Sequence, residues 1–207
     1  LHYRAFMRVL EPLGLGFDYT RYLRDFIGCD DRDAFRLALA PKPLSDQELA
    51  ELITRKSEAF DAVVAEGVEL FPGVIELISD AADDLAIAIC SGALRSDIDG
   101  IMAGVGDGKM LNRFDAIVTA EDVARSKPDP ASYMLAATRL GIDPGNCLAI
   151  EDTPAGLASA KGAEMKTLGV ATTHDAAALS ADRIEPNLAD ITLEELRRWW
   201  ASRFEVD

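Results

Sequence analysis

A few side chains in this sequence could together bind a phosphate group and a divalent cation. Ser91 precedes Gly92, Lys127 lies in a proline-rich loop, and Glu151 and Asp152 are adjacent. A hydroxyl and free backbone N–H groups ahead of a helix bind anions, and a lysine ammonium acts as a point charge for phosphate. Neighbouring carboxylates suit a hard cation such as Mg²⁺, which prefers oxygen ligands. The combination indicates phosphate chemistry, provided that the fold brings the groups together.

Each group also has an ordinary structural explanation. Ser91 could cap the helix that follows it, as serine commonly does. Lys127 could be a solvated loop lysine, which is the usual fate of that residue type. Asp152 or Thr153 could cap the next helix. Only their relative positions in the fold can separate these alternatives.

All three sites follow short apolar segments that are typical of buried strands. From "ELFPGV" onward, strands and helices alternate. The predicted strands are 85–90, 116–119, 148–150, 167–170 and 182–184, and the predicted helices are 74–82, 94–103, 130–140, 154–161 and 192–204. This alternation predicts an α/β fold with a doubly wound parallel sheet. Ligands in such sheets bind at the carboxyl ends of the strands, where the three sites lie.

The first part of the chain shows helical patterns only. Helices are expected over 1–13, 19–27, 31–40 and 45–66, and the last of these begins with a capping box formed by Ser45 and Glu48. The sequence therefore predicts two parts, a helical one at 1–69 and an α/β one at 70–207.

Composition narrows the class of partner. The net charge of −15 disfavours nucleic acid and anionic membranes, which attract basic patches. No apolar run approaches the roughly 18 residues of a membrane span, and no signal peptide is visible. Cys29, Cys90 and Cys147 are widely spaced and odd in number, and the last two lie in apolar runs. Buried free thiols and a cytoplasmic location are expected, with a monomer or a homodimer both open.

The strand-end segments resemble the haloacid dehalogenase superfamily of phosphohydrolases. "ICSGA" is similar to its second motif, "SKPDP" to its third, and "IEDTPAGLASAKGAEMKTLGV" to its fourth. "HYRAF", "IGCDDRDAFR" and "TRKSEAF" resemble the helical cap of the beta-phosphoglucomutase and phosphoglycolate phosphatase branch, and "ELFPGVIELI" resembles the hinge between cap and core.

The resemblance implies a role for each strand-end residue. Ser91 and the N–H of Gly92 would hold phosphate oxygens, and Lys127 would bridge the phosphate and a nucleophilic carboxylate. Asp152 would be a Mg²⁺ ligand, and Glu151 either a second ligand or an acceptor just outside the metal shell.

The resemblance also implies functional residues in the cap. Arg32 and Lys56 stand where the branch places substrate-binding cations, and His2 matches a residue near the hinge. All three could equally be surface residues, because cap residues vary with the substrate.

The superfamily's first motif is absent from this sequence. That motif is an apolar strand ending in Asp-x-Asp-Gly-Thr, whose first Asp attacks phosphorus. It would stand just upstream of Leu1, so the chain is either a shortened form of an active enzyme or a polypeptide without its nucleophile. The missing strand would be the middle one, between the strands ending at Cys90 and Ile150. Its absence should leave two apolar strand edges facing an empty slot.

The resemblance thus implies a Mg²⁺-dependent phosphatase that acts on a small phosphorylated metabolite through an aspartyl phosphate. A sugar phosphomutase is the nearest alternative, and a non-catalytic module that binds phosphate or metal is the third. A dehalogenase is disfavoured, because the acidic pair implies a metal that dehalogenation does not use. Phosphoglycolate, hexose phosphates and nucleoside monophosphates all remain open as substrates.

Overall fold

Four α-helices form the N-terminal part of the computed structural model, which describes residues 1–105 and 108–202. They are α1 (His2–Leu10), α2 (Tyr19–Asp25), α3 (Asp31–Leu39) and α4 (Asp46–Ala65), with the 3₁₀ turn η1 (Glu11–Leu13) after α1. The capping box at α4 is confirmed, because Ser45 and Glu48 each accept a hydrogen bond from the other's backbone N–H. We call this helical part the cap.

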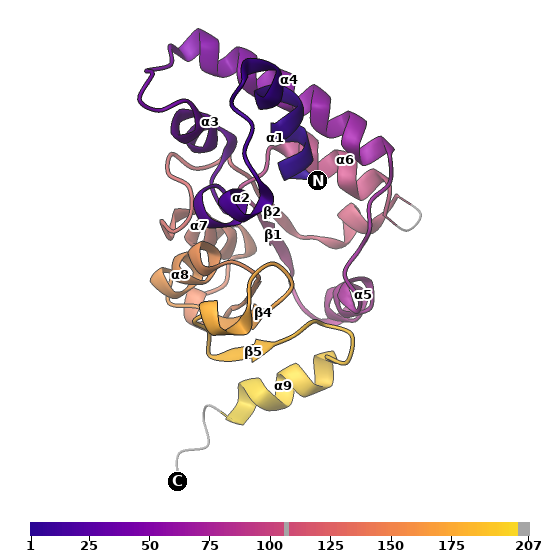
Figure 1. The fold of residues 1–207 in the computed structure, drawn as a ribbon. Coiled ribbons are helices and arrows are strands. Elements are labelled where there is room, and N and C mark those ends of the chain that lie inside the picture. The colour runs from indigo at the N-terminus through magenta and orange to yellow at the C-terminus, as the bar shows by residue number, and fades with distance from the viewer. Residues whose placement is uncertain (106–107, 203–207) are drawn as a thin grey trace.

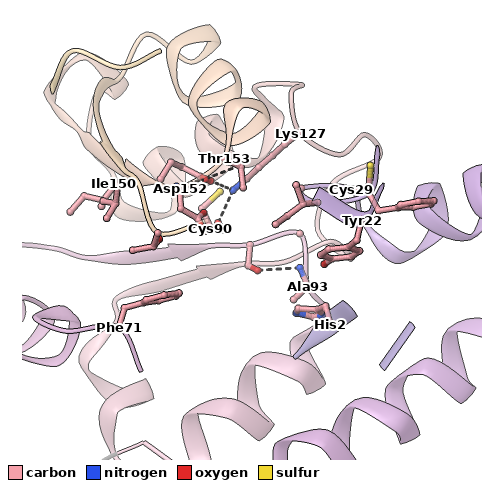
Figure 2. Close-up of a pocket in the computed structure, with 18 of the residues that line it drawn as sticks. His2, Tyr22, Cys29, Phe71, Cys90, Ala93, Lys127, Ile150, Asp152 and Thr153 are labelled. Carbon is pink, nitrogen blue, oxygen red and sulfur yellow. Dashed lines mark hydrogen bonds and ion pairs between the residues drawn. The ribbon is translucent and has the colours of Figure 1, made fainter. Parts of the chain in front are cut away.

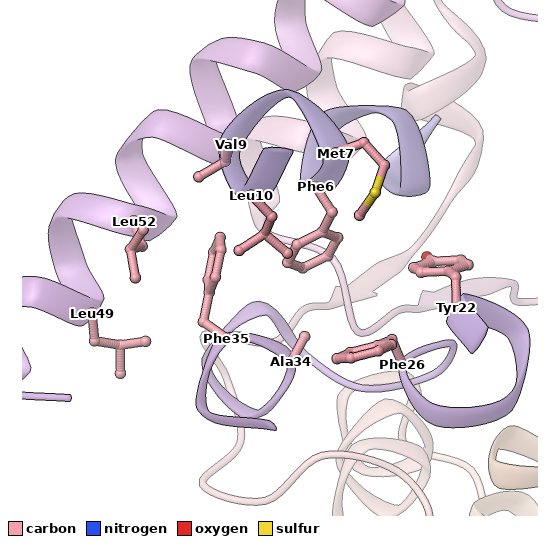
Figure 3. Close-up of a cluster of buried hydrophobic side chains, with 10 residues drawn as sticks. All are labelled: Phe6, Met7, Val9, Leu10, Tyr22, Phe26, Ala34, Phe35, Leu49 and Leu52. Carbon is pink, nitrogen blue, oxygen red and sulfur yellow. The ribbon is translucent and has the colours of Figure 1, made fainter. Parts of the chain in front are cut away.

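The cap has its own apolar core. Figure 3 shows Phe6 and Leu10 of α1 facing Phe35 of α3 and Leu52 of α4, and Phe35 is fully buried. The ring centroids of Phe6 and Phe35 are 5.0 Å apart. A compact aromatic cluster of this kind holds the four helices in one arrangement.

Strands and helices alternate after the cap. The elements are α5 (Val74–Asp84), β1 (Ala88–Cys90), α6 (Arg95–Ala103), η2 (Met110–Arg113), β2 (Ala116–Val118), α7 (Ala131–Leu140), η3 (Pro144–Asn146), β3 (Leu148–Glu151), α8 (Pro154–Gly162), β4 (Lys166–Val170), η4 (Ala176–Ala178), β5 (Arg183–Glu185) and α9 (Leu193–Ser202). The expected end of the last helix, at 203–204, lies outside the described residues. In Figure 1 the strands lie between the cap helices and α9. Among the described residues, no helix combines the length and the apolar character that crossing a membrane requires.

The connection from the cap to the strands depends on a glycine. Gly73 precedes α5 with φ of 81°, in the left-handed region that favours glycine. A Cβ atom at Gly73 would lie 2.0 Å from the carbonyl oxygen of Leu188. Any side chain here would force the chain away from the loop that precedes α9.

The strands form two separate parallel sheets. β1 pairs with β2, and β3, β4 and β5 pair in that order. The parallel α/β arrangement confirms the predicted fold class. Among the described residues, β1 and β3 are not paired with each other. In the described part of the chain, the N-terminal residues form α1 of the cap and do not enter the sheet.

An apolar cavity of about 600 Å³ lies between the two sheets. We call this cavity the slot. Residues of both facing strands line it, among them Ala88 and Cys90 of β1 and Leu148 and Ile150 of β3. Ile150 of β3, an edge strand of the three-stranded sheet, is 39% exposed, whereas the strands of parallel sheets are usually buried on both faces. Cys90 and Cys147 are free thiols, as expected. The expectation that they are buried was wrong: both are half-buried, because both line the slot.

Candidate active site

Ser91 lies at the carboxyl end of β1, in the turn before α6. Its N–H donates to Val118 O at 2.9 Å, which ties the turn to β2. Its hydroxyl oxygen accepts a hydrogen bond from the N–H of Ala93 at 3.1 Å. The N-cap residue of α6 is Leu94 rather than Ser91, and its side chain makes no capping hydrogen bond. The Ser91 hydroxyl therefore stays in the turn and keeps its own proton to donate.

Lys127 follows β2 and is almost buried, with 9% of its side chain exposed. Its Nζ donates to Cys90 O at 3.1 Å and forms an ion pair with Glu151. The ammonium also lies 4.9 Å from the ring centroid of Tyr133. Contacts with three different elements fix the position of this charge, which a solvated loop lysine would not have.

Glu151, the last residue of β3, has its acceptor positions filled by protein donors. Oε1 accepts from Lys127 and from the Tyr133 hydroxyl at 2.8 Å. Oε2 accepts from Asp152 N and from the Thr153 hydroxyl, both at 3.2 Å. A carboxylate offers about four lone-pair sites. Of the two roles left open for Glu151, the acceptor outside the metal shell fits this geometry better than the metal ligand.

The first turn of α8 is built around the Glu151 carboxylate. Thr153 is the N-cap, because its hydroxyl accepts from Gly156 N at 3.0 Å. A Cβ atom at Gly156 would lie 2.1 Å from the Glu151 carboxylate. Gly156 is thus needed for close approach of that carboxylate to the positive end of the helix.

The Asp152 carboxylate has one described hydrogen bond, which the Thr173 hydroxyl donates to its Oδ2. Its side chain is half-buried and lines the same pocket as Lys127. Among the described residues, no group of three or more His, Cys, Asp or Glu side chains could hold a metal ion. One carboxylate still fits Mg²⁺, because that cation keeps several waters and takes one or two carboxylates together with substrate phosphate oxygens.

The fold brings the three strand-end groups to one pocket. Ser91, Lys127 and Asp152 all line a cavity of about 510 Å³ at the carboxyl ends of β1, β2 and β3. Figure 2 shows Asp152 and Lys127 on one side of it, with Tyr22 and His2 of the cap on others. Gly92 faces the cap closely, since a Cβ atom there would lie 3.7 Å from the carbonyl oxygens of Gly28 and Cys29. A phosphate in this pocket would meet a hydroxyl, an ammonium and a carboxylate able to share a metal.

Of the three cap residues that the resemblance marked as functional, one lines this pocket and two lie where the cap contacts the core. His2 lines the pocket, whereas Arg32 and Lys56 do not. Arg32 donates to Asp30, to Ala120 O at 3.1 Å and to Val123 O at 3.2 Å, so it joins the cap to the loop after β2.

Lys56 is completely buried between two carboxylates. Its Nζ lies 2.6 Å from Asp97 Oδ2 and 3.0 Å from Asp31 Oδ2. Asp97 belongs to α6 and Asp31 to α3, so the lysine of α4 joins cap and core.

Sequence reasoning missed three residues that shape the site. Tyr133 of α7 orients Glu151, and burial together with that carboxylate raises the pKa of its phenol, so the phenol keeps the proton that it donates. Tyr22 and Asp31 line the pocket from the cap. A tyrosine three residues after "SKPDP" was the available signal for the first, whereas nothing local marks the other two.

Comparison with known proteins gives concordant matches. The family described as haloacid dehalogenase-like hydrolase matches residues 1–170. The CbbY protein of Rhodobacter capsulatus is 34% identical over 175 residues, which cover 81% of this chain and 77% of that protein. Fructose-1-phosphate phosphatase YqaB of Escherichia coli is 27% identical over 171 residues, covering 82% and 87%. A crystal structure of a CbbY variant from Rhodobacter sphaeroides with xylulose-(1,5)-bisphosphate superposes with a TM-score of 0.84 at 25% identity, covering 94% and 91%.

Proposed function

The chain belongs to the haloacid dehalogenase-like hydrolase family, as its motifs predicted. On that basis we propose that it supplies the cap and the phosphate-binding groups of a Mg²⁺-dependent phosphatase for a small phosphorylated metabolite. Phosphorylated sugars are the favoured class, because related proteins carry names such as fructose-1-phosphate phosphatase. The observation that carries the proposal is the convergence of Ser91, Lys127 and Asp152 on one pocket beneath the cap.

The residues of this chain bind and orient the phosphate in the proposed reaction. The Ser91 hydroxyl and the N–H of Gly92 donate to phosphate oxygens, and Lys127 neutralises charge that develops during transfer. Glu151 holds the Lys127 ammonium in place and leaves Asp152 for the cation. Bound Mg²⁺ supplies Lewis-acid stabilisation of the phosphoryl group.

The nucleophile in this proposal is a carboxylate at the end of a strand that occupies the slot. The carboxylate oxygen forms a bond to phosphorus while the bond from phosphorus to the ester oxygen breaks, and the leaving oxygen takes a proton from water to become an alcohol. Water then cleaves the aspartyl phosphate, which releases inorganic phosphate and regenerates the carboxylate. The slot opens beside the pocket, since Cys90 and Ile150 line both cavities. A strand between them would therefore end among the phosphate-binding groups.

The first prediction concerns Asp152. We expect Asp152→Asn to weaken Mg²⁺-dependent binding of inorganic phosphate by about 10- to 100-fold, because the amide gives up the charge that holds the cation. Isothermal titration calorimetry with inorganic phosphate, with and without Mg²⁺, measures the effect. Asp175→Asn is the matched control, since Asp175 is exposed and lies outside the pocket. If Asp152→Asn bound phosphate with unchanged Mg²⁺ dependence, Asp152 would not hold the metal and the proposal would fail.

A further inference from the structure

The cap side of the pocket contains no lysine or arginine among the described residues that line it. Its lining includes Phe6 and Phe26, which are almost fully buried in the cap core, and the polar residues His2, Tyr22 and Asp31. Asp31 is the one acidic residue that the cap contributes to this lining. The opposite side carries the phosphate-binding groups, so the two sides differ in what they can recognise.

The two cap cations that the sequence marked as substrate-binding candidates, Arg32 and Lys56, are engaged in joining cap and core. Arg32 pairs with Asp30 and donates to backbone carbonyls of the loop after β2. Lys56 has no exposed side-chain surface and lies between Asp31 and Asp97. Releasing Lys56 would leave Asp31 and Asp97 buried without a cation, and releasing Arg32 would remove the counter-charge of the buried Asp30 carboxylate, which is costly in both cases. Neither is free to meet a charged substrate group.

The remaining cap groups are suited to neutral hydroxyls. Burial, together with the nearby Lys56 ammonium, lowers the pKa of His2 to about 3, so this imidazole carries no charge near neutral pH. Burial also raises the pKa of the Tyr22 phenol, which therefore keeps its proton. In the described part of the chain the Tyr22 hydroxyl has no hydrogen-bond partner, so it is free to donate.

Asp31 adds an acceptor beside that donor. Its side chain is 8% exposed, and its Oδ2 lies 3.0 Å from Lys56 Nζ. A sugar hydroxyl both donates and accepts, so a phenol and a carboxyl group together can bind it. A second phosphate or a carboxylate would instead approach the Asp31 carboxyl group, and Lys56, which already pairs with that group, has no exposed side-chain surface with which to meet a second anion.

We infer that this site selects phosphomonoesters whose leaving group is uncharged and carries hydroxyls, and that it rejects substrates with a second anionic group. The inference rests on the proposed function, since it assumes that phosphate binds at Ser91 and Lys127. The inferred preference differs from that of a site that binds bisphosphates, such as the xylulose-(1,5)-bisphosphate bound in the related CbbY structure. It also removes phosphoglycolate from the open substrates and keeps hexose monophosphates.

Matched ligand pairs test the inference on the 207-residue chain. Calorimetric titrations with Mg²⁺ would compare fructose 1-phosphate with fructose 1,6-bisphosphate, and 2-hydroxyethyl phosphate with phosphoglycolate. Because placing like charges together at an interface costs several kcal/mol, we expect the neutral member of each pair to bind at least roughly tenfold more tightly. Equal or tighter binding of the anionic member, together with normal binding of inorganic phosphate, would overturn the inference and leave the proposed function intact. Failure to bind inorganic phosphate would overturn both.

A substitution tests whether Asp31 causes the discrimination. Asp31→Asn keeps the side-chain volume and leaves Lys56 paired with Asp97, and a thermal melt reports whether the fold is retained. We expect the preference within each pair to shrink by about fivefold or more, since the carboxylate is lost. Asp46→Asn removes the same charge from an exposed position of the cap and should leave the preference unchanged. If the two variants behave alike, Asp31 does not set the specificity and the inference fails.

Discussion

An apolar strand ending in Asp-x-Asp-Gly-Thr, placed ahead of Leu1, is expected to raise the phosphatase activity of the 207-residue chain strongly. The strand would fill the slot, whose walls are apolar residues of β1, β3, α5 and α7. Its carboxyl end would then lie beside Lys127 and Asp152, which face the neighbouring pocket. Loss of a catalytic nucleophile typically costs at least about 10³-fold, so the gain should be of that size or larger. Hydrolysis of p-nitrophenyl phosphate with Mg²⁺ measures it.

The same extension should stabilise the fold independently of the chemistry. Each aliphatic side chain that becomes fully buried contributes about 1.5–3 kcal/mol, so even two would raise the free energy of unfolding by roughly 3–6 kcal/mol. The strand also supplies backbone partners to the free edges of β1 and β3.

A variant extension separates packing from catalysis. When the first Asp of the strand is changed to Asn, the extension should raise thermal stability as much as the unaltered extension does. Turnover should stay at the level of the unextended chain. Two results would contradict the proposal: an unextended chain that turns over as fast as the extended one, or an extension that changes neither stability nor rate.

Local sequence patterns predicted the elements of this fold well, and the reasons are local. Helix α4 begins where Ser45 and Glu48 form a capping box, and α8 begins at Thr153 and Pro154, both of which are standard helix-start residues. The expectation of unpaired strand edges beside Cys90 and Ile150 came from the family resemblance rather than from local patterns, because the motif that forms the family's middle strand is absent from this sequence. Boundaries shifted by a few residues where strands are short: the predicted strand 85–90 begins at Ala88 in the structure.

The partners of the charged groups were not predictable, because they come from distant parts of the chain. Glu151 was a metal candidate on its position after a strand, but Lys127 and Tyr133 occupy its oxygens from 24 and 18 residues away. No pattern along the chain reveals that competition.

The cap shows the same limit. Lys56 resembles a substrate-binding cation in its local sequence, yet Asp97, 41 residues further on, holds it in the interface. Burial and pairing are tertiary properties, and they decide which charges remain available to a substrate.

Replacing Lys56 is expected to cause the largest loss of stability among single substitutions in this interface. Lys56→Met keeps most of the volume of the side chain but leaves Asp31 and Asp97 buried next to each other without a cation. Removing one partner of a buried ion pair costs about 3–5 kcal/mol, because the remaining charge is uncompensated. The ammonium also lies 4.8 Å from the ring centroid of Phe60, and that cation–π contact is lost as well. Chemical denaturation followed by circular dichroism measures the change.

The pH dependence of that loss identifies its cause. Burial raises the pKa of both Asp31 and Asp97 already in the unsubstituted protein, and removal of Lys56 should raise both pKa values further. A carboxyl group whose pKa is higher in the folded state than in the unfolded state destabilises the fold at pH values above the unfolded pKa. That penalty is relieved as the pH falls toward the unfolded pKa and the folded group takes up a proton. The deficit of Lys56→Met should therefore shrink between about pH 7 and about pH 5, near the usual carboxyl range.

Two further variants make this prediction decisive. Lys42→Met removes an exposed lysine that pairs with Glu48, and such surface pairs contribute about 0–1 kcal/mol. Adding Asp97→Asn to Lys56→Met removes one of the two stranded carboxylates, so it should recover part of the lost stability and flatten the pH dependence. If Lys56→Met costs no more than Lys42→Met, or if Asp97→Asn makes the double variant weaker still, then the lysine does not act as the counter-charge that joins cap and core. In that case Lys56 would be free to serve the substrate, and the inferred preference for neutral leaving groups would lose one of its supports.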